Sequence, residues 1–323
     1  MTDLHATLIG CGKFPHRTTG PFGPGYGLGL RKSRFRLEAA VDVDSRIASN
    51  FTEQFGGRPF RTLPQALSWM KPDLLIVASS DASHAENLIA ALEHDNCPQL
   101  VIVEKPVCSE ASEMANISKL ASERAIKIVV NHSRRFSPWY RNLRSRIQRG
   151  DFGEAIEVQA TFYNGWLHNG VHVVDTILFL FGERIVMSRS DNPKDLYGSG
   201  TSSRLRSGHM KGGECSILFS EFLSDAYQIF EFDLRFEKMR LQIDDFSSSY
   251  RHQAVMRNTE GESVLHPTES DLGPLAENSM AILLQEAAEF IEQGVSDGLD
   301  DADLNSSIVT MRTLWSTDEL GRP

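Results

Sequence analysis

Two histidines and an aspartate stand close together in GWLHNGVHVVDTILFLFG, residues 165–182. His168 and His172 are four residues apart, and Asp175 follows three residues later. Residues four apart share one face of a helix, so these imidazoles could chelate zinc as the histidines of HExxH motifs do. Alternatively, His172 could exchange a proton with a substrate, since histidine ordinarily titrates near neutrality. A third interpretation is a structural histidine at the start of a buried helix.

The residues between the two histidines argue against zinc. They are Asn169, Gly170 and Val171, so no glutamate is present to act as a base. Glycine also suits the start of a helix better than its interior. The sequence shows no third ligand, and we therefore expect no metal ion here. The apolar run 173–181 is predicted to be core.

Lys105 lies at the end of another apolar run, in VIVEKPV. Parallel sheets bind their ligands at the carboxyl ends of their strands. The following proline disfavours a helical conformation for the lysine, so its ammonium group is expected to face a ligand crevice. An ordinary surface lysine before a turn is the alternative.

Gly10 and Gly12 follow the first apolar run in TLIGCGKFPHR. Such glycines allow a tight turn and a close approach of backbone N–H groups to a pyrophosphate, although they also occur in ordinary turns. Pro15 stands where the usual third glycine would be. The density of Gly and Pro from Gly20 to Gly25 forbids a regular helix, so the first helix is predicted to be shortened, delayed or replaced.

Asp42 is the candidate for the carboxylate that binds the adenosine ribose. It lies 30 residues beyond Gly12 instead of roughly 20, which an insertion in the glycine-rich loop explains. Its charge would repel the phosphate of NADP, so NAD is the expected cofactor. Asp44 is a second candidate for this role. Arg46 could accommodate the phosphate of NADP, so NADP remains an alternative cofactor.

The elements that would position these residues form two patterns. Five runs rich in Val, Ile and Leu alternate with polar helical segments and predict a parallel sheet wound with helices. These runs are residues 6–12, 35–44, 72–80, 99–106 and 125–132. We predict a dinucleotide-binding domain over residues 1–131.

The second pattern begins after residue 131. Alternating apolar residues in 230–236 and 239–243 predict a mostly antiparallel sheet with one wet face. Residues 277–294 and 300–321 are predicted helices, the first ending at Gly294. We expect residues 132–323 to form an α+β domain.

Composition narrows the class of protein. The chain is 41% hydrophobic and 24% charged, as in globular proteins. Its net charge of -10 disfavours nucleic acid and anionic lipid as partners. No basic leader or membrane-spanning run is evident, and the four cysteines lack paired spacing. A cytoplasmic location is therefore expected.

The motifs GCG, EKP, NHSRRFSP and NGVHVVD, in this order, resemble the Gfo/Idh/MocA family of NAD(P)-dependent sugar and cyclitol oxidoreductases. The resemblance extends over essentially the whole chain. It implies an N-terminal Rossmann domain and a second domain built on a large open β-sheet. In that family the sheet commonly carries the dimer or tetramer contact.

The resemblance also implies a site. Lys105 and His172 would act at the reacting carbon, and the expected substrate contacts are His168, Asp175, Arg135 and Trp166. The expected cofactor contacts are Gly10, Gly12, Lys13, Phe14, Asp42, Ser79, His84, Glu104 and Lys105. His168 replaces an aspartate usual in the family, and Ser80 and Asp81 also depart from its pattern.

The expected function is therefore hydride transfer between a nicotinamide cofactor and a sugar, cyclitol or nucleotide-linked sugar. Lys105 would stabilise the alkoxide and His172 would exchange the proton. The expected assembly is a homodimer or homotetramer. Two alternatives remain: a non-catalytic NAD- or sugar-sensing regulator of the same fold, and a metal-dependent hydrolase using His168 and His172.

Overall fold

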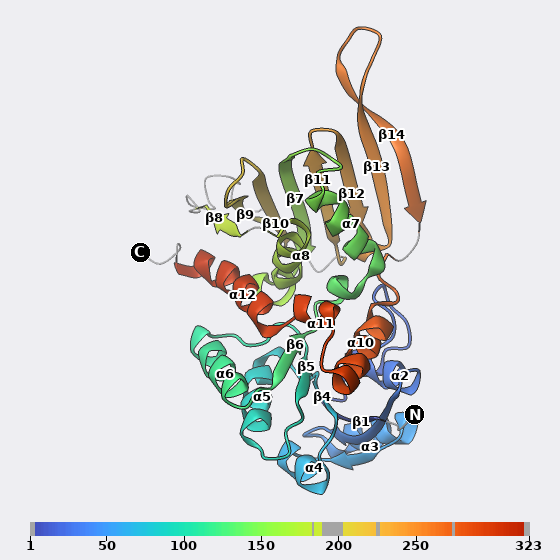
Figure 1. Ribbon diagram of the computed structural model, residues 1–323, viewed down its shortest axis with the longest axis vertical. Helices are drawn as coiled ribbons and strands as arrows, with labels where there is room; N and C mark the ends of the chain where they lie inside the picture. Colours follow the sequence, from blue (N-terminus) through green and yellow to red (C-terminus); the bar gives the residue numbers. More distant parts are fainter. Residues whose placement is uncertain (1–3, 183, 189–202, 224–226, 273–274, 320–323) are drawn as a thin grey trace. The chain divides into compact units, whose positions relative to one another are not determined.

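Two compact units make up the computed structural model (Figure 1), which describes residues 4–182, 184–188, 203–223, 227–272 and 275–319. Unit 1 comprises residues 1–137 and 277–308, and unit 2 comprises residues 138–276 and 309–323. The sequence analysis placed residues 277–308 in the second domain, whereas their contacts assign them to unit 1. An apolar helix face in this segment, described below, is the physical reason.

Unit 1 contains a six-stranded parallel sheet in the order β3-β2-β1-β4-β5-β6. The near-continuous apolar runs form its central strands because both faces of the sheet are buried. The strands are β1 (Leu4–Ile9), β2 (Phe35–Val41), β3 (Arg58–Phe60), β4 (Leu74–Val77), β5 (Leu100–Val103) and β6 (Lys127–Val130). The predicted parallel sheet is confirmed. The sequence analysis missed only the short edge strand β3, whose RPF sequence has no apolar run.

Helices cover both faces of this sheet. The apolar face of α10 carries Met280 and Leu284, which join Leu30, Ile76 and Ile102 in one buried cluster. Helices α5 and α6 pack together on the other side of the sheet (Figure 1). The helices are α3 (Ser45–Phe55), α4 (Leu63–Trp69), α5 (His84–Glu93), α6 (Ala111–Glu123), α10 (Ser279–Gln293) and α11 (Asp297–Asp301). As predicted, α10 ends at Gly294, in the left-handed conformation.

The glycine- and proline-rich segment folds into the core of unit 1. The first helix is replaced by α1 (Lys13–His16) and α2 (Tyr26–Arg31), with no helix between them. A Cβ atom on Gly25 would lie 2.0 Å from the Phe14 carbonyl oxygen, so only glycine allows these two helices to approach so closely. Tyr26 and Leu30 are buried. The predicted disruption of the first helix is therefore confirmed.

Unit 2 contains an eight-stranded sheet in the order β14-β13-β12-β11-β7-β10-β9-β8. Only β7 and β10 pair in parallel, so the predicted mostly antiparallel sheet is confirmed. Its strands are β7 (Ala155–Tyr163), β8 (Ile185–Met187), β9 (Ser203–Met210), β10 (Ser216–Phe222), β11 (Phe230–Phe236), β12 (Met239–Asp244), β13 (Ser249–Arg257) and β14 (Ser263–Leu272).

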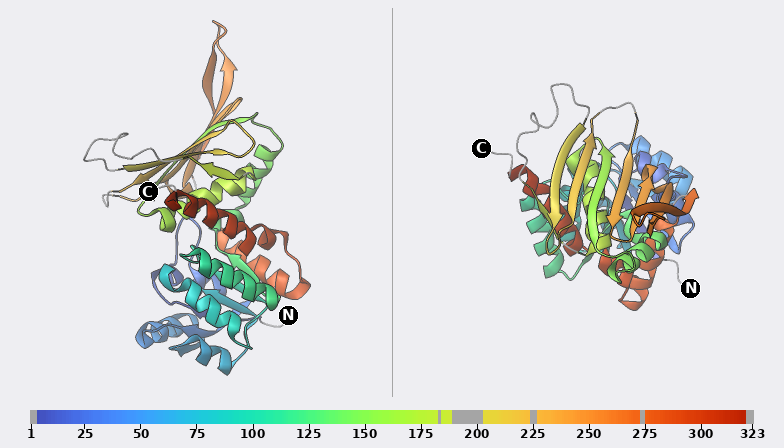
Figure 2. Two further views of the ribbon diagram at one scale, coloured as in Figure 1. Left: turned by 90° about the vertical axis from the view of Figure 1, so that its left-hand side faces the viewer. Right: turned by 90° about the horizontal axis from the view of Figure 1, so that it is seen from above.

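One face of this sheet is covered by helices and the other is open (Figure 2). Helices α7 (Pro138–Gln148) and α8 (Val171–Phe181) pack on the covered face, where Phe181 stacks on Phe236 at 6.0 Å. Helix α12 (Leu304–Glu319) contacts the same layer through Leu314. Alternation along β11 buries Phe232 and leaves Asp233 on the open face. None of the described helices is long and apolar enough to cross a membrane.

Candidate active site

The glycine turn after β1 lies against the carboxyl ends of β2 and β4. The Gly10 N–H donates to the Val41 carbonyl at 2.8 Å. Gly10 has a φ of +87°, and a Cβ atom on it would lie 2.4 Å from the Ala78 carbonyl oxygen. At Gly12, by contrast, a Cβ atom would meet nothing within 4 Å. The turn therefore leaves open space beside its backbone, as close approach of a pyrophosphate requires.

Asp42 stabilises the glycine turn through a hydrogen bond to its backbone. Its carboxylate accepts hydrogen bonds from the backbone N–H groups of Cys11 and Asp44, both at 3.0 Å. Asp44 instead caps α3 by accepting from the Arg46 N–H at 2.9 Å, and it pairs with the exposed Arg46 guanidinium. Of the two competing aspartates, Asp42 is thus the one at the glycine turn.

His84 links the segments that follow β4 and β5. Its buried ring places Nδ1 2.7 Å from the Pro106 carbonyl oxygen and Nε2 3.0 Å from the Ser79 carbonyl oxygen. The Ser79 hydroxyl accepts hydrogen bonds from Ser83 and Asn87. These contacts fix the backbone at two adjacent strand ends.

Lys105 lies two residues beyond the end of β5, at the carboxyl end of this strand as predicted, and its peptide bond to Pro106 is cis. Burial lowers the pKa of its ammonium group, while the charges of Asp81 and Glu104 oppose that shift. Asp81 belongs to the short 3-10 helix η1 (Asp81–Ser83), which follows β4. From the sequence, Asp81 is only a departure from the family pattern, and its electrostatic effect on Lys105 was missed.

Glu104 lies in a buried polar cluster with Tyr26 and Asn131. The Tyr26 hydroxyl donates to Glu104 Oε1 at 2.8 Å, and Asn131 Nδ2 donates to the same oxygen at 2.7 Å. Burial raises the pKa of Glu104, and the two donors counteract this rise. Sequence reasoning missed Tyr26. The one feature of the sequence that could have identified Tyr26 is its position between two glycines in a segment rich in turn residues.

The other expected contacts in unit 1 have varied surroundings. Lys13 is exposed, and the half-buried Phe14 ring meets Tyr26 edge-on at 5.7 Å. Arg135 is buried in η2 (Ser133–Phe136) and donates to the Asp301 carbonyl oxygen at 2.5 Å. Arg134 lies over the Phe22 ring.

In unit 2 the two histidines have contrasting environments. His168 is exposed on the π-helical turn η3 (Trp166–Gly170). His172 lies in the first turn of α8 and is half-buried, although Val171 and residues 173–180 are all buried. Its ring meets Phe230 edge-on at 6.0 Å. Helix α8 begins after Gly170 as expected, but Gly170 is itself helical as the last residue of η3 and therefore does not start the helical segment.

Asp175 and Trp166 lie inside the layer between helices and sheet. The Asp175 carboxylate accepts a hydrogen bond from Thr310 Oγ1 at 3.1 Å. The Trp166 indole N–H donates to the Leu314 carbonyl oxygen at 3.1 Å, and its ring packs against Phe219. These contacts are those of core residues that support α8 and η3.

A buried ion pair holds the start of η3. Glu221 is buried, and its carboxylate accepts hydrogen bonds from the Gly165 N–H at 3.1 Å and Arg206 Nη1 at 2.8 Å. The Arg206 guanidinium also lies 4.4 Å from the centre of the Trp166 ring. The sequence analysis missed this pair because nothing in the pattern of β9 or β10 singles it out.

The part of the chain that the structure describes contains no group of three His, Cys, Asp or Glu side chains suited to a metal ion. The glycine turn at the carboxyl end of β1 and the order of the parallel strands are instead typical of a dinucleotide-binding Rossmann domain. Residues 4–132 match the family GFO_IDH_MocA, described as an oxidoreductase family with an NAD-binding Rossmann fold. Over these residues the resemblance stated from the motifs is thereby confirmed, as is the expected class of cofactor.

Known proteins extend this comparison. Inositol 2-dehydrogenase 3 of Saccharopolyspora erythraea is 24% identical over 170 residues, 49% of each protein, so the chain spans about half of this relative. A 3-ketoreductase of Actinomadura kijaniata, solved with NADP, has a TM-score of 0.74 at 16% identity, covering 98% of this chain and 97% of that one. The transcriptional regulator Gal80p of Kluyveromyces lactis has a TM-score of 0.73 at 14% identity, covering 99% and 89%. These structures share the fold of both units.

Proposed function

We propose that this protein is an NAD(H)-preferring oxidoreductase acting on a hydroxyl or ketone carbon of a sugar, a cyclitol or a nucleotide-linked sugar. The observation that carries the proposal is Lys105, a half-buried lysine two residues beyond the end of β5. It lies at the edge of the sheet where parallel α/β proteins bind their ligands. The family match of residues 4–132 and the inositol dehydrogenase relatives support the same reaction.

The proposed chemistry divides between two side chains. When bound, the nicotinamide supplies the hydride chemistry. During oxidation of a secondary alcohol, the Lys105 ammonium stabilises the negative charge that develops on the substrate oxygen. His172 accepts the hydroxyl proton, and during reduction it returns that proton. Such acid/base assistance is typically worth about 10²–10⁴ in rate.

The proposed cofactor contacts are those around the glycine turn. Gly10, Gly12, Lys13 and Phe14 would approach the pyrophosphate, and Asp42 would bind the ribose hydroxyls. The carboxylate of Asp42 favours NAD because it repels the extra phosphate of NADP. Ser79, His84, Glu104 and Lys105 would line the nicotinamide end.

Among the proposed substrate contacts, the exposed His168 is the strongest candidate. It occupies the position of the family's usual aspartate on a turn that leads into the helix of His172. Trp166 and Asp175 would act mainly by supporting that turn and helix, given their buried contacts. Arg135 is also a proposed substrate contact. One of its guanidinium nitrogens donates a hydrogen bond to the Asp301 carbonyl oxygen.

A substrate screen tests the proposed function. The purified protein is mixed with NAD or NADP and with cyclitols, sugars or nucleotide sugars, and nicotinamide absorbance is followed. Lys105→Ala and His172→Asn should each lower kcat/KM by about 10²-fold or more. Lys119→Ala, which removes an exposed lysine paired with Glu123, is the matched control and should behave as the wild type. Equal turnover by Lys105→Ala and wild type would show the assignment of Lys105 to be wrong.

A regulator of the same fold is the second candidate. The likeness to Gal80p over nearly the whole chain favours it, because the fold alone does not imply catalysis. The two functions differ in one result. A regulator would bind the dinucleotide yet turn over none of the substrates tested.

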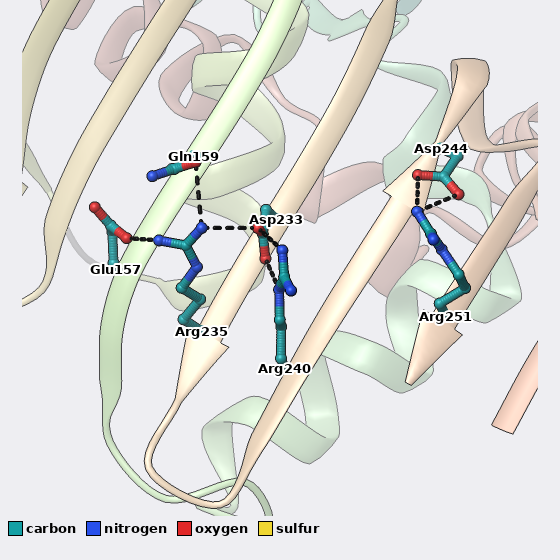
Figure 3. Close-up of polar contacts among 7 residues, drawn as sticks. All are labelled: Glu157, Gln159, Asp233, Arg235, Arg240, Asp244 and Arg251. Atoms are coloured by element: carbon teal, nitrogen blue, oxygen red, sulfur yellow. Dashed lines mark hydrogen bonds and ion pairs between the residues drawn. The ribbon is translucent and has the colours of Figure 1, made fainter. Parts of the chain in front are cut away.

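We also propose that the open face of the unit 2 sheet carries a contact between copies of the chain. A network of charges crosses its central strands (Figure 3). Arg235 on β11 contacts Glu157 and Gln159 on β7, and Asp233 links Arg235 to Arg240 on β12. Alternating acids and arginines on one face are self-complementary, so a two-fold symmetric copy could bind there.

Light scattering during size-exclusion chromatography tests this assembly. The wild type should elute as a dimer or tetramer, and Arg235→Glu should shift it to a monomer because like charges would then meet across the face. Lys119→Glu, on the exposed surface of α6, is the control and should leave the mass unchanged. A monomeric wild type contradicts the proposed assembly.

A further inference from the structure

Tyr26 connects two parts of the proposed site within unit 1. It begins α2, the helix that ends the glycine- and proline-rich segment, and its side chain is completely buried. Its ring meets that of Phe14 edge-on, on the helix directly after the glycine turn. Its hydroxyl contacts Glu104, the residue before Lys105. The segment is thus fixed between the glycine turn and the end of β5.

The polar atoms of Tyr26, Glu104 and Asn131 form a closed triangle. Tyr26 Oη donates to Glu104 Oε1 at 2.8 Å and accepts from Asn131 Nδ2 at 3.0 Å. Asn131 Nδ2 also donates to Glu104 Oε1 at 2.7 Å. Each residue comes from a different part of unit 1, since Asn131 follows β6. Buried polar groups in such a network hold one another in a single geometry.

We propose that Tyr26 is a positioning residue for the Glu104–Lys105 pair: with Asn131, its hydroxyl orients the Glu104 carboxylate and keeps it ionised beneath Lys105. This inference rests on the proposed function for its role in catalysis, although the network itself does not. It assigns a role to the segment that replaces the first helix, which delivers a phenol to the end of β5.

The electrostatics follow from the groups that face the pair. Glu104 faces the hydroxyl of Tyr26, the amide of Asn131, and the charges of Lys105 and His84. Lys105 faces Asp81 and Glu104. Burial disfavours the charged form of both Glu104 and Lys105, and each charge supports the other. Loss of the Tyr26 hydroxyl therefore raises the pKa of Glu104. Once Glu104 takes up a proton, the pKa of Lys105 falls further.

Side-chain NMR of the full-length protein tests this coupling without any substrate. The Lys105 signal is followed in protein labelled with ¹³C-lysine and assigned with Lys105→Arg. In Tyr26→Phe, Lys105 should lose its proton at lower pH than in the wild type. Tyr140→Phe is the matched control, because Tyr140 is equally buried and its hydroxyl lies 2.7 Å from Ser247 Oγ in unit 2. This control should leave the Lys105 titration unchanged.

A double-mutant cycle then shows whether Tyr26 acts through Glu104. Glu104→Gln should lower the pKa of Lys105, and adding Tyr26→Phe to this variant should not change that pKa further. Asn131→Leu removes the second donor and should shift Lys105 in the same direction, which provides a test if Tyr26→Phe does not fold. The inference would be overturned if Lys105 had the same pKa in the wild type, Tyr26→Phe and Asn131→Leu. It would also be overturned if Tyr26→Phe lowered the pKa of Lys105 as much in the Glu104→Gln background as in the wild type.

Kinetics separate this inference from the proposed function. With a substrate identified, Tyr26→Phe should lower kcat/KM by about tenfold and move its alkaline limb to lower pH, because protonated Lys105 is the active form. Tyr140→Phe should retain the wild-type profile. If Lys105→Ala keeps full turnover while Tyr26→Phe still shifts the Lys105 signal, the proposed catalytic role of Lys105 is wrong, but the coupling between Tyr26 and Lys105 is supported. If instead Lys105→Ala abolishes turnover while Tyr26→Phe leaves the Lys105 signal unchanged, the proposed function stands and Tyr26 has no positioning role.

Discussion

The carboxylate of Glu221 and the guanidinium of Arg206 form a buried ion pair, with a hydrogen bond of 2.8 Å between them. The side chain of Glu221 is 5% exposed and that of Arg206 is 15% exposed. Glu221 also accepts from the N–H of Gly165, the residue that precedes η3. The turn carrying His168 is therefore attached to the sheet through a charge that has little access to water.

Glu221→Gln should consequently destabilise the protein, because the partly buried Arg206 would lose the charge of its hydrogen-bond partner. The expected loss in free energy of unfolding is about 1.5–3 kcal/mol, measured by urea denaturation. Glu123→Gln is the matched control, since it breaks an ion pair with the exposed Lys119 and should cost at most about 1 kcal/mol. Similar losses in the two variants would show that burial of the Glu221 pair has no energetic effect.

The two glycines of the glycine turn should respond differently to alanine. Gly10→Ala forces a Cβ atom against the Ala78 carbonyl oxygen at positive φ, so the melting temperature should fall by several degrees. Gly12→Ala places its Cβ atom in open space and should leave the melting temperature within about 2 °C of the wild type. It should nevertheless weaken NADH binding, measured by fluorescence titration. Unimpaired binding by Gly12→Ala would place the pyrophosphate elsewhere.

Asp42→Ser should reduce the preference for NADH over NADPH. The substitution removes the charge that would repel the 2′-phosphate, so NADPH should bind more tightly than it does to the wild type. Asp44→Ser is the control, because Asp44 caps α3 and should not change the ratio of the two dissociation constants. An altered ratio in the Asp44 variant alone would transfer the role from Asp42 to Asp44.

Three buried cysteines should make the protein less stable at alkaline pH. Burial raises the pKa of Cys11 and Cys108 to about 12 and that of Cys97 to about 11. The ordinary value is 9.0, so above pH 9 the unfolded chain loses thiol protons that the folded chain retains. The free energy of unfolding should therefore decrease between about pH 9 and 11, by up to about 1.4 kcal/mol per pH unit for each thiol.

Urea denaturation at several pH values from 8 to about 10.5 checks this slope. Cys97→Ala should have a shallower slope than the wild type, whatever its stability at pH 8, because one thiol no longer contributes. An unchanged slope would mean that Cys97 loses its proton equally easily in both states.

Much of the fold could be predicted from the sequence because its signals are local. The apolar runs before Gly10 and Lys105 identify strands with both faces buried, and the alternation in residues 230–236 identifies a sheet with one covered face. Gly294 ends its helix where the pattern predicts. The edge strand β3 gives no such signal because it has only three residues and little apolar surface.

The contacts of the site depend on long-range geometry that spacing does not encode. Tyr26 lies 78 residues from Glu104 along the chain, and Arg206 lies 15 residues from Glu221 on the neighbouring strand. Motifs identified Lys105 and His172 as candidates because their residue types and neighbours are distinctive. Their supporting partners come from turns and strand ends with ordinary compositions, so only the folded chain identifies them.

The return of residues 277–308 to unit 1 affects how the protein is made. Met280 and Leu284 complete the core that Leu8 and Ile102 begin. During synthesis on a ribosome, α2 and α3 can cover part of this face early, whereas the part beneath α10 stays exposed until that helix is made. A gene fragment ending at residue 131 would leave that part of the apolar face bare, and its product should aggregate instead of binding a dinucleotide.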